Sequence, residues 1–233
     1  MIHDMNRRDF MKASAAATGA VMMAGTVSPA RAEELKSIQL QRPQPGSGNP
    51  LMQVLWKRQS ARQFSQEPLP VEVLSNLLWA AFGINRPDGK RTAPTANNKQ
   101  EMEIYVATAK GLYLYDAPAN LLNPVLPDDI RGLTGIPAQP YVKDAAVNLV
   151  YVADYSKMKN YFFGTVREEV KDLYTAAATG LISQNVYLFC AAEGLATVVR
   201  AEIDRPALAS VMKLRPDQKI ILAQSVGYPK KAS

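Results

Sequence analysis

The sequence predicts one domain of mixed helices and strands, of the α+β or α/β class. Segments with a helical spacing of apolar residues alternate along the chain with short apolar runs of strand length. The chain has 233 residues, which suits one domain better than two large ones. Its composition, 47% hydrophobic and 21% charged, is that of ordinary globular proteins and excludes disorder over most of the length.

The N-terminal part of the predicted domain contains an arm and two helices. Residues 33–50 are rich in proline and glycine, which predicts an extended arm outside the core. Pro50 suits the first position of a helix that runs through Lys57. Residues 70–82 predict a second helix, because their leucines and alanines fall on one face. We expect the main domain to span residues 51–233.

The middle of the chain predicts a loop and then strands. Residues 85–100 show no apolar period, which indicates a loop. Residues 128–133 predict a short helix. Three apolar runs have the length and composition of strands: residues 102–108, 112–115 and 147–155.

Residues 165–193 predict the longest helix, which ends at Gly194. Ala176 to Gly180 are small enough for another helix to approach closely. Two strands are predicted after it, at residues 196–203 and 219–226, with a short helix between them. An apolar stripe runs along the long helix: Val170, Leu173, Tyr174, Ala177, Leu181, Leu188 and Ala192.

Charge and the rarest residue types exclude several kinds of site. Lys and Arg number 27 against 21 Asp and Glu, and this modest excess is spread out, so we expect no nucleic-acid partner. The single cysteine, Cys190, permits no disulfide within the chain. The single histidine, His3, lies at the extreme N-terminus. A histidine-ligated zinc site or a Ser-His-Asp triad is therefore excluded unless His3 serves, and we predict no metal site.

Residues 1–32 differ in composition from the rest. Arg7 and Arg8 begin a charged stretch, an uncharged apolar run covers residues 13–27, and a small-residue site ends at Ala32. These parts predict a removable signal peptide, and the paired arginines resemble the twin-arginine export signal. The apolar run is short of the ~20 residues of a membrane helix, although an uncleaved anchor stays an alternative. We expect export, to the periplasm or beyond, through the twin-arginine machinery, and no stable membrane span after cleavage.

Two arginines flank a serine just after the first predicted helix. In extended backbone Arg58, Ser60 and Arg62 point the same way. Two guanidinium forks and one hydroxyl suit a phosphate group. The alternative is a solvated charged loop, because such triplets are common.

Three other polar segments have both a functional and an ordinary interpretation. Residues 94–100 can hydrogen-bond the edge of a heteroaromatic ring, or form a plain polar loop. Gln184 and Asn185 lie in an apolar helix and need partners, for which another helix is the simplest source. Residues 225–231 end a strand in a glycine turn and two lysines, which is also the pattern of a basic tail.

The order and spacing of these motifs resemble the nitroreductase family of FMN flavoproteins over residues 51–230. The arginine–serine–arginine triplet is similar to the phosphate-binding motif of that family. Residues 94–100 are similar to its loop that reaches the flavin ring, typically from the partner subunit. Residues 184–197 are similar to its central dimer helix and next strand, and residues 227–229 to its closing Gly-Tyr-Pro. Residues 111–116 resemble the thiazole/oxazole peptide dehydrogenase branch.

The resemblance implies an α+β fold with a central mixed or antiparallel sheet, flanking helices and a long central dimer helix. It implies FMN at a homodimer interface and assigns no catalytic residue. Thr95 replaces the usual serine, and Ala201-Glu202 stands where many members carry Glu-Gly. Lys230 would replace basic ligands that the family places further on. The implied cofactor contacts are Arg58, Ser60, Arg62, Thr95, Ala96, Asn98, Gln100, Val199, Arg200 and Lys230.

Resemblance and leader together imply an exported FMN-dependent oxidoreductase that transfers hydride between a donor and a small organic acceptor. The substrate would be a small molecule or a peptide. The electron donor stays open, because no NAD(P)H pool is expected outside the cytoplasm. Two alternatives remain: an exported non-catalytic module that binds flavin or another ligand on the same fold, and a basic surface-binding protein without cofactor.

Overall fold

The computed structural model describes residues 35–41, 51–161 and 164–231. All of them belong to the unit from Glu33 to Ser233. The leader lies outside the described residues, and so does Pro50. Among the helices in these three ranges, none is both long and apolar enough to cross a membrane.

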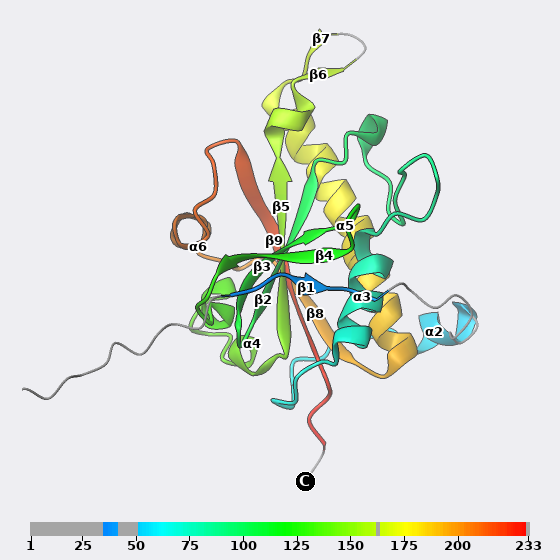
Figure 1. Ribbon diagram of the computed structural model, residues 1–233, viewed down its shortest axis with the longest axis vertical. Coiled ribbons are helices and arrows are strands. Elements are labelled where there is room, and N and C mark those ends of the chain that lie inside the picture. The colour runs from blue at the N-terminus through cyan, green and yellow to red at the C-terminus, as the bar shows by residue number, and fades with distance from the viewer. Residues whose placement is uncertain (1–34, 42–50, 162–163, 232–233) are drawn as a thin grey trace, which may run out of the picture. The chain divides into compact units, whose positions relative to one another are not determined.

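One twisted sheet forms the centre of the described unit (Figure 1). Its seven strands follow the order β1-β4-β3-β2-β5-β9-β8, and every neighbouring pair is antiparallel. This confirms the α+β class with an antiparallel sheet. The strand bounds are β1 Ile38–Gln39, β2 Met102–Thr108, β3 Gly111–Asp116, β4 Leu121–Leu126, β5 Val147–Asp154, β8 Ala196–Arg200 and β9 Gln218–Gly227.

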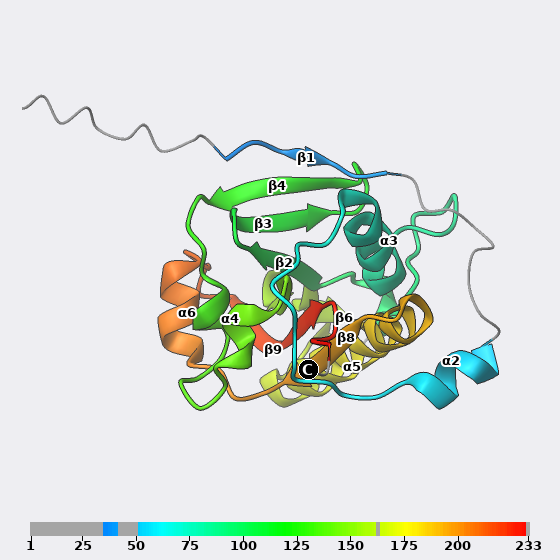
Figure 2. The ribbon, with the colours of Figure 1, turned by 90° about the horizontal axis from the view of Figure 1, so that it is seen from below.

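Helices cover both faces of this sheet. Figure 2 shows α3 (Val71–Phe82) and α5 (Glu168–Glu193) on one side, and α4 (Tyr141–Asp144) and α6 (Arg205–Val211) on the other. Helix α2 (Leu51–Lys57) contacts α5. The remaining short elements are 3₁₀ turns η1 (Ala96–Asn98), η2 (Arg131–Thr134) and η3 (Tyr155–Met158), and a small hairpin of β6 (Asn160–Tyr161) and β7 (Gly164–Thr165).

The core lies mainly between the sheet and the α3–α5 layer. Helix α3 inserts residues at helical spacing from Leu74 to Ala81, and Leu77 is 0% exposed. All eight residues of β5 are buried, because helices cover it on both faces. Helix α5 turns Ala178, Ile182 and Val186 toward the same cluster.

Two strands of the seven-stranded sheet were not predicted from the sequence, and neither was the small β6–β7 hairpin. Strand β4 contains Pro124, which is unusual inside strands and hid the pattern. Strand β1 lies in the predicted arm, where Ile38 pairs with Leu122 of β4. Leu40 next to it is 3% exposed and belongs to the main core. The prediction that residues 33–50 stay outside the core is therefore wrong at Leu40. The local sequence does not reveal this burial, because the strand that pairs with this segment lies about 80 residues further along the chain.

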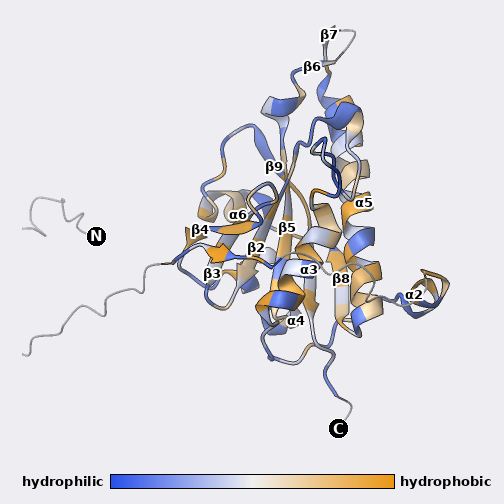
Figure 3. Ribbon diagram, turned by 45° about the vertical axis from the view of Figure 1, so that its right-hand side comes forward, coloured by the Kyte–Doolittle hydropathy of each residue, from blue (hydrophilic) through white to orange (hydrophobic). Residues whose placement is uncertain are grey.

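The predicted apolar stripe of the long helix faces away from the sheet. Leu173 is 65% exposed and Leu181 48% exposed, and Ala177 between them is also exposed. The ribbon of α2 is largely coloured as hydrophobic (Figure 3). Among its side chains, Trp56 is 87% exposed and Met52 66% exposed.

Leu77→Ala should lower the free energy of unfolding by about 2–5 kcal/mol, because it empties space in a close-packed core. Urea unfolding measures the change. Leu133→Ala is the matched control, since Leu133 is 51% exposed, and should change stability by less than about 1 kcal/mol. Equal losses in the two variants would contradict the assignment of the core.

Candidate functional site

The arginine–serine–arginine segment is bound to the edge of the sheet. The backbone N–H of Ala61 donates to the carbonyl of Thr197 in β8 at 2.9 Å. The N–H of Lys230 donates to the carbonyl of Gln63 at 3.1 Å. Residues 58–65 therefore run between the edge strand β8 and the chain that follows β9.

This pairing gathers three basic side chains and one hydroxyl at a single edge: Arg58, Ser60, Arg62 and Lys230. Arg58 is half-buried and the other three are exposed. Within the described ranges, no ion pair involves any of the three basic groups. Positive charge without an acidic partner, combined with a hydroxyl, suits an anion with several oxygens, such as a phosphate.

Tyr187 of α5 lies under this segment and contacts three residues around it: Ser60, Val199 and Arg58. Its Oη is 2.8 Å from Ser60 Oγ and accepts the backbone N–H of Val199 at 3.0 Å. The guanidinium carbon of Arg58 is 5.4 Å from its ring centroid. Sequence analysis missed Tyr187. The available signal was its polar hydroxyl on the inward side of an apolar helix, since a buried tyrosine needs a partner.

A small cavity of about 210 Å³ lies behind the segment. Lys57, Gln59 and Ala61 line it together with the end of α5, whereas none of the three motif residues does. Alternate residues thus face opposite ways, as extended backbone requires. Cys190 also lines this cavity, and burial raises the pKa of its thiol well above the ordinary range, so it is no nucleophile.

Arg200 ends β8, but its side chain turns into the protein. It is 5% exposed and donates to the Thr134 carbonyl at 2.6 Å and to Asn148 Oδ1 at 3.2 Å. Burial lowers its pKa to about 10, so it stays charged at neutral pH. Because this side chain is used inside the protein, any contact of Arg200 with a cofactor would come from its main chain.

The predicted ring-contact loop, residues 94–100, has an unusual backbone. Asn97, Asn98 and Gln100 all adopt left-handed conformations, with φ of 50°, 52° and 47°. Asparagine tolerates this region better than other non-glycine residues, and glutamine does so at a cost. Three such residues in one loop indicate strain, which folded proteins retain mainly at functional sites.

Internal hydrogen bonds hold this loop in shape. The Gln100 side chain donates to the Gly89 carbonyl at 3.0 Å and accepts from Arg91 Nε at 2.7 Å. The N–H of Gln100 donates to Thr95 Oγ1 at 2.9 Å. The amide of Gln100 therefore serves the loop itself. Asn98 keeps the N–H donors of its side-chain amide, which can face a ligand.

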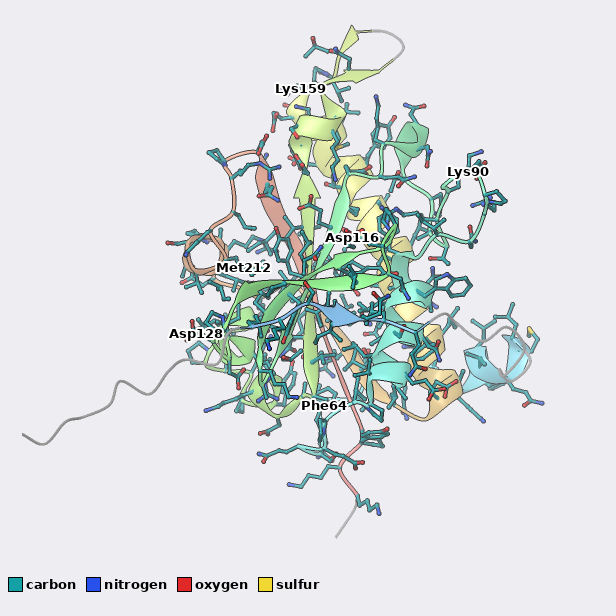
Figure 4. All side chains as sticks on the ribbon, viewed as in Figure 1. Phe64, Lys90, Asp116, Asp128, Lys159 and Met212 are labelled. Atoms are coloured by element: carbon teal, nitrogen blue, oxygen red, sulfur yellow. The ribbon has the colours of Figure 1, made fainter. Side chains whose placement is uncertain are left out.

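One chain holds the loop and the basic segment apart. Figure 4 shows Phe64, which belongs to the basic segment, below the sheet, and Lys90, in the stretch before the loop, at the upper right. The hydrogen bonds of Thr95, Asn98 and Gln100 stay within the loop and the stretch just before it. None of these bonds joins the loop to the basic segment.

Glu101, directly after the loop, is a second residue that the sequence analysis missed. It is 0% exposed, and both oxygens of its carboxyl group are buried. Burial raises the pKa of Glu101, and the Thr95 hydroxyl and the Lys157 charge oppose this shift without cancelling it. No local pattern reveals such burial, because a glutamate beside a polar loop reads as solvated.

Fold and site together define an α+β protein with a cluster of basic side chains at one edge of its sheet. The chain belongs to the nitroreductase family, whose family model matches residues 55–228. It is thus an oxidoreductase of the flavin-dependent class. A twin-arginine translocation signal matches residues 4–24, which confirms the predicted export signal, and the protein is exported.

Three relatives illustrate the family likeness. A solved nitroreductase homologue from Ralstonia eutropha JMP134 is 40% identical with a TM-score of 0.78, over 84% of this chain and 90% of that one. A homologue from Desulfovibrio desulfuricans, solved in complex with FMN, is 25% identical with a TM-score of 0.56, over 79% and 90%. A nitroreductase homologue from Methanocaldococcus jannaschii is 27% identical over 177 residues, 71% of this chain and 85% of its own length.

Glu101→Gln should remove one pH dependence of stability. A carboxyl whose folded-state pKa is raised contributes fully below its unfolded pKa, about 4.3, and that contribution is lost as pH rises through the folded-state value. The free energy of unfolding of the wild-type protein should fall over this window, and the variant should lack this fall. Thermal unfolding between about pH 4 and pH 8 measures it.

Glu67→Gln, at an exposed glutamate, is the control and should keep the wild-type profile. If the profiles of the wild type and Glu101→Gln run parallel over the whole range, Glu101 does not carry the buried proton that its surroundings favour.

Proposed function

We propose that this protein is an exported FMN-dependent oxidoreductase that transfers hydride between a donor and a small organic molecule or peptide. The observation that carries the proposal is the unneutralised basic cluster of Arg58, Arg62 and Lys230 around Ser60. The chain belongs to the nitroreductase family, and the likeness of this segment to the phosphate-binding motif of that family supports the proposal.

The residues at this edge fit the chemistry of FMN. Two guanidinium groups, one ammonium and one hydroxyl supply donors for the phosphate oxygens. Val199 and Arg200 end the edge strand beside this cluster and would face the flavin ring with their backbone. Thr95, Ala96 and Asn98 would complete the ring contacts. We assign these three to the partner subunit, because within one chain they lie away from the basic segment.

The same geometry supports a homodimer. The outward face of α5 carries small residues, Ala176, Ala177 and Gly180, between the exposed Leu173 and Leu181. Small residues allow close approach of a second helix, and the flanking leucines supply apolar area. The exposed side chains of α2 extend this surface. A second copy seated on it would bring the two halves of the site together.

When bound, FMN supplies the redox chemistry through its ring system. The chain's own residues would anchor and orient it. Arg58, Arg62 and Lys230 hold the phosphate and place positive charge at that end of the site. No protein acid need deliver a proton, because water can. Cys190 takes no part, since its thiol is buried and protonated.

Export limits the choice of electron donor. Outside the cytoplasm no NAD(P)H pool is expected, so the enzyme would oxidise an exported molecule or draw electrons from another carrier. The likeness of residues 111–116 to the peptide dehydrogenase branch leaves a peptide substrate open. Steady reduction of the flavin by NADPH in a cytoplasmic form of the protein would contradict this reading.

One feature favours a non-catalytic flavin-binding module as second candidate. The Gln100 amide, a predicted ring contact, is used inside its own loop. Tight FMN binding without turnover across many donors and acceptors would support this candidate. An absorption spectrum of exported protein, with mass analysis of the released chromophore, tests both, because a colourless protein that refuses FMN would exclude either.

Arg58→Ala and Arg62→Ala should each weaken FMN binding by roughly 1.5–3 kcal/mol, because each removes a charge-assisted hydrogen bond to the phosphate. Fluorescence titration of the apoprotein measures the affinity. Lys57→Ala is the control, since Lys57 lines the cavity behind the segment and should leave the affinity unchanged. Unchanged affinity in both arginine variants would place the phosphate elsewhere.

Ala177→Glu should give flavin-free monomers, because it buries a charge in the proposed helix contact. Sedimentation and absorption at the flavin band measure assembly and loading together. Ala138→Glu adds the same charge at an exposed position before α4 and should stay dimeric and loaded. A flavin-loaded dimer of Ala177→Glu would refute the assigned interface.

A further inference from the structure

The hydroxyl of Tyr187 joins the main chain of β8 to the side chain of Ser60. Val199 N–H donates to Tyr187 Oη at 3.0 Å, and Ser60 Oγ lies 2.8 Å from the same oxygen on the other side. These are the hydrogen-bond partners of Tyr187 Oη among the described residues. The tyrosine is 8% exposed, so it has little access to water as a substitute.

The number of hydroxyl hydrogens available decides which group donates in the hydrogen bond between Tyr187 and Ser60. Tyr187 Oη already accepts one N–H, and its single hydrogen needs an acceptor. If Ser60 donated to it, that hydrogen would be left without one in a buried place, which is costly. If Tyr187 donates to Ser60 Oγ instead, the buried donors, Val199 N–H and the Tyr187 hydroxyl, are both satisfied. The hydroxyl hydrogen of Ser60, which is exposed, then points outward and is free to donate to a ligand.

Such a chain also strengthens its last member. Each hydrogen bond polarises the next, so a relay from N–H through one hydroxyl to another makes the terminal hydroxyl a better donor. The polarising effect of the Val199 N–H is thereby passed through Tyr187 to the hydroxyl of Ser60, which lies beside the guanidinium groups. A phosphate is the kind of ligand that gains from it.

The ring of Tyr187 acts on the neighbouring arginine. The guanidinium carbon of Arg58 lies 5.4 Å from the ring centroid, within the range of a cation–π contact. This contact limits the rotamers of a long side chain that has no acidic partner among the described ion pairs. One side chain of α5 thus restrains both Arg58 and Ser60.

We propose that Tyr187 is the positioning residue of the phosphate half-site: its hydroxyl directs the hydrogen of Ser60 to a phosphate oxygen, and its ring holds Arg58 in place. This inference rests on the proposed function, because the phosphate is that of FMN. Tyr187 itself does not touch the phosphate. It couples the half-site to the long helix.

Comparison of FMN with riboflavin, which lacks the phosphate, isolates this role. Tyr187→Phe keeps the ring and removes the hydroxyl. We expect its Kd for FMN to rise about tenfold, the loss typical of one hydrogen bond to a charged group, with the Kd for riboflavin changed less than about twofold. Tyr187→Leu should weaken FMN further, because Arg58 also loses its ring contact. Fluorescence titration of the apoprotein with each flavin gives both constants.

A double-mutant cycle tests whether Tyr187 acts through Ser60. Ser60→Ala should weaken FMN by a similar factor, and the combined variant should be no weaker than Ser60→Ala alone. Ser183→Ala is the matched control, because it removes a buried hydroxyl one turn earlier on α5 whose partner among the described residues is the Gly180 carbonyl of its own helix. It should leave both flavin affinities unchanged.

The outcomes separate this inference from the function on which it rests. Equal weakening of FMN and riboflavin in Tyr187→Phe would indicate general loosening and overturn the inference. Independent, multiplying effects of the two single changes would overturn it as well. In both cases FMN binding by the wild-type protein would still stand. A wild-type protein that binds neither flavin would overturn the proposed function and the inference together.

Discussion

The burial of one face of α5 against the sheet is the constraint on which the rest of the molecule depends. Ala178, Ile182 and Val186 pack into the main core, so the helix cannot turn about its axis without exposing them. This orientation fixes two other surfaces. It holds Tyr187 under the basic segment, and it leaves the stripe around Leu181 exposed. The orientation of α5 against the sheet therefore sets the geometry of the proposed anion site and of the surface that we assign to a second copy.

Buried polar groups then fix the register of the strands beneath the site. Tyr151 of β5 donates to Gln224 of β9 at 2.6 Å, and the Gln224 amide donates to Thr197 of β8 at 3.1 Å. Arg200 of β8 reaches Asn148 of β5. A shift of the strand register by one residue would leave these buried polar groups without hydrogen-bond partners. The polar groups therefore specify the register more strictly than apolar contacts alone would. Because the Thr197 carbonyl also holds the basic segment, the register of β8 places the phosphate half-site.

The division of the site agrees with the export signal. In the proposed dimer, the basic segment comes from one copy and the ring-contact loop from the other, so the proposed site would form after two folded copies associate. A cofactor held between copies is loaded before export if the chain crosses the membrane already folded, which is the route that a twin-arginine signal implies. Catalysis outside the cytoplasm then depends on how firmly the phosphate end is held, because a lost flavin is not readily replaced there.

Local patterns in the sequence determined most elements and the motif. The strand at Met102–Thr108 and the helix at Val71–Phe82 follow from periodicity, and Arg58-x-Ser60-x-Arg62 is visible because its members are close in sequence. The arm residue Leu40, the relay through Tyr187 and the buried state of Glu101 were decided only by tertiary structure. Each depends on partners far along the chain, and burial or a hydroxyl bond of that kind leaves no periodic trace in the residues around it.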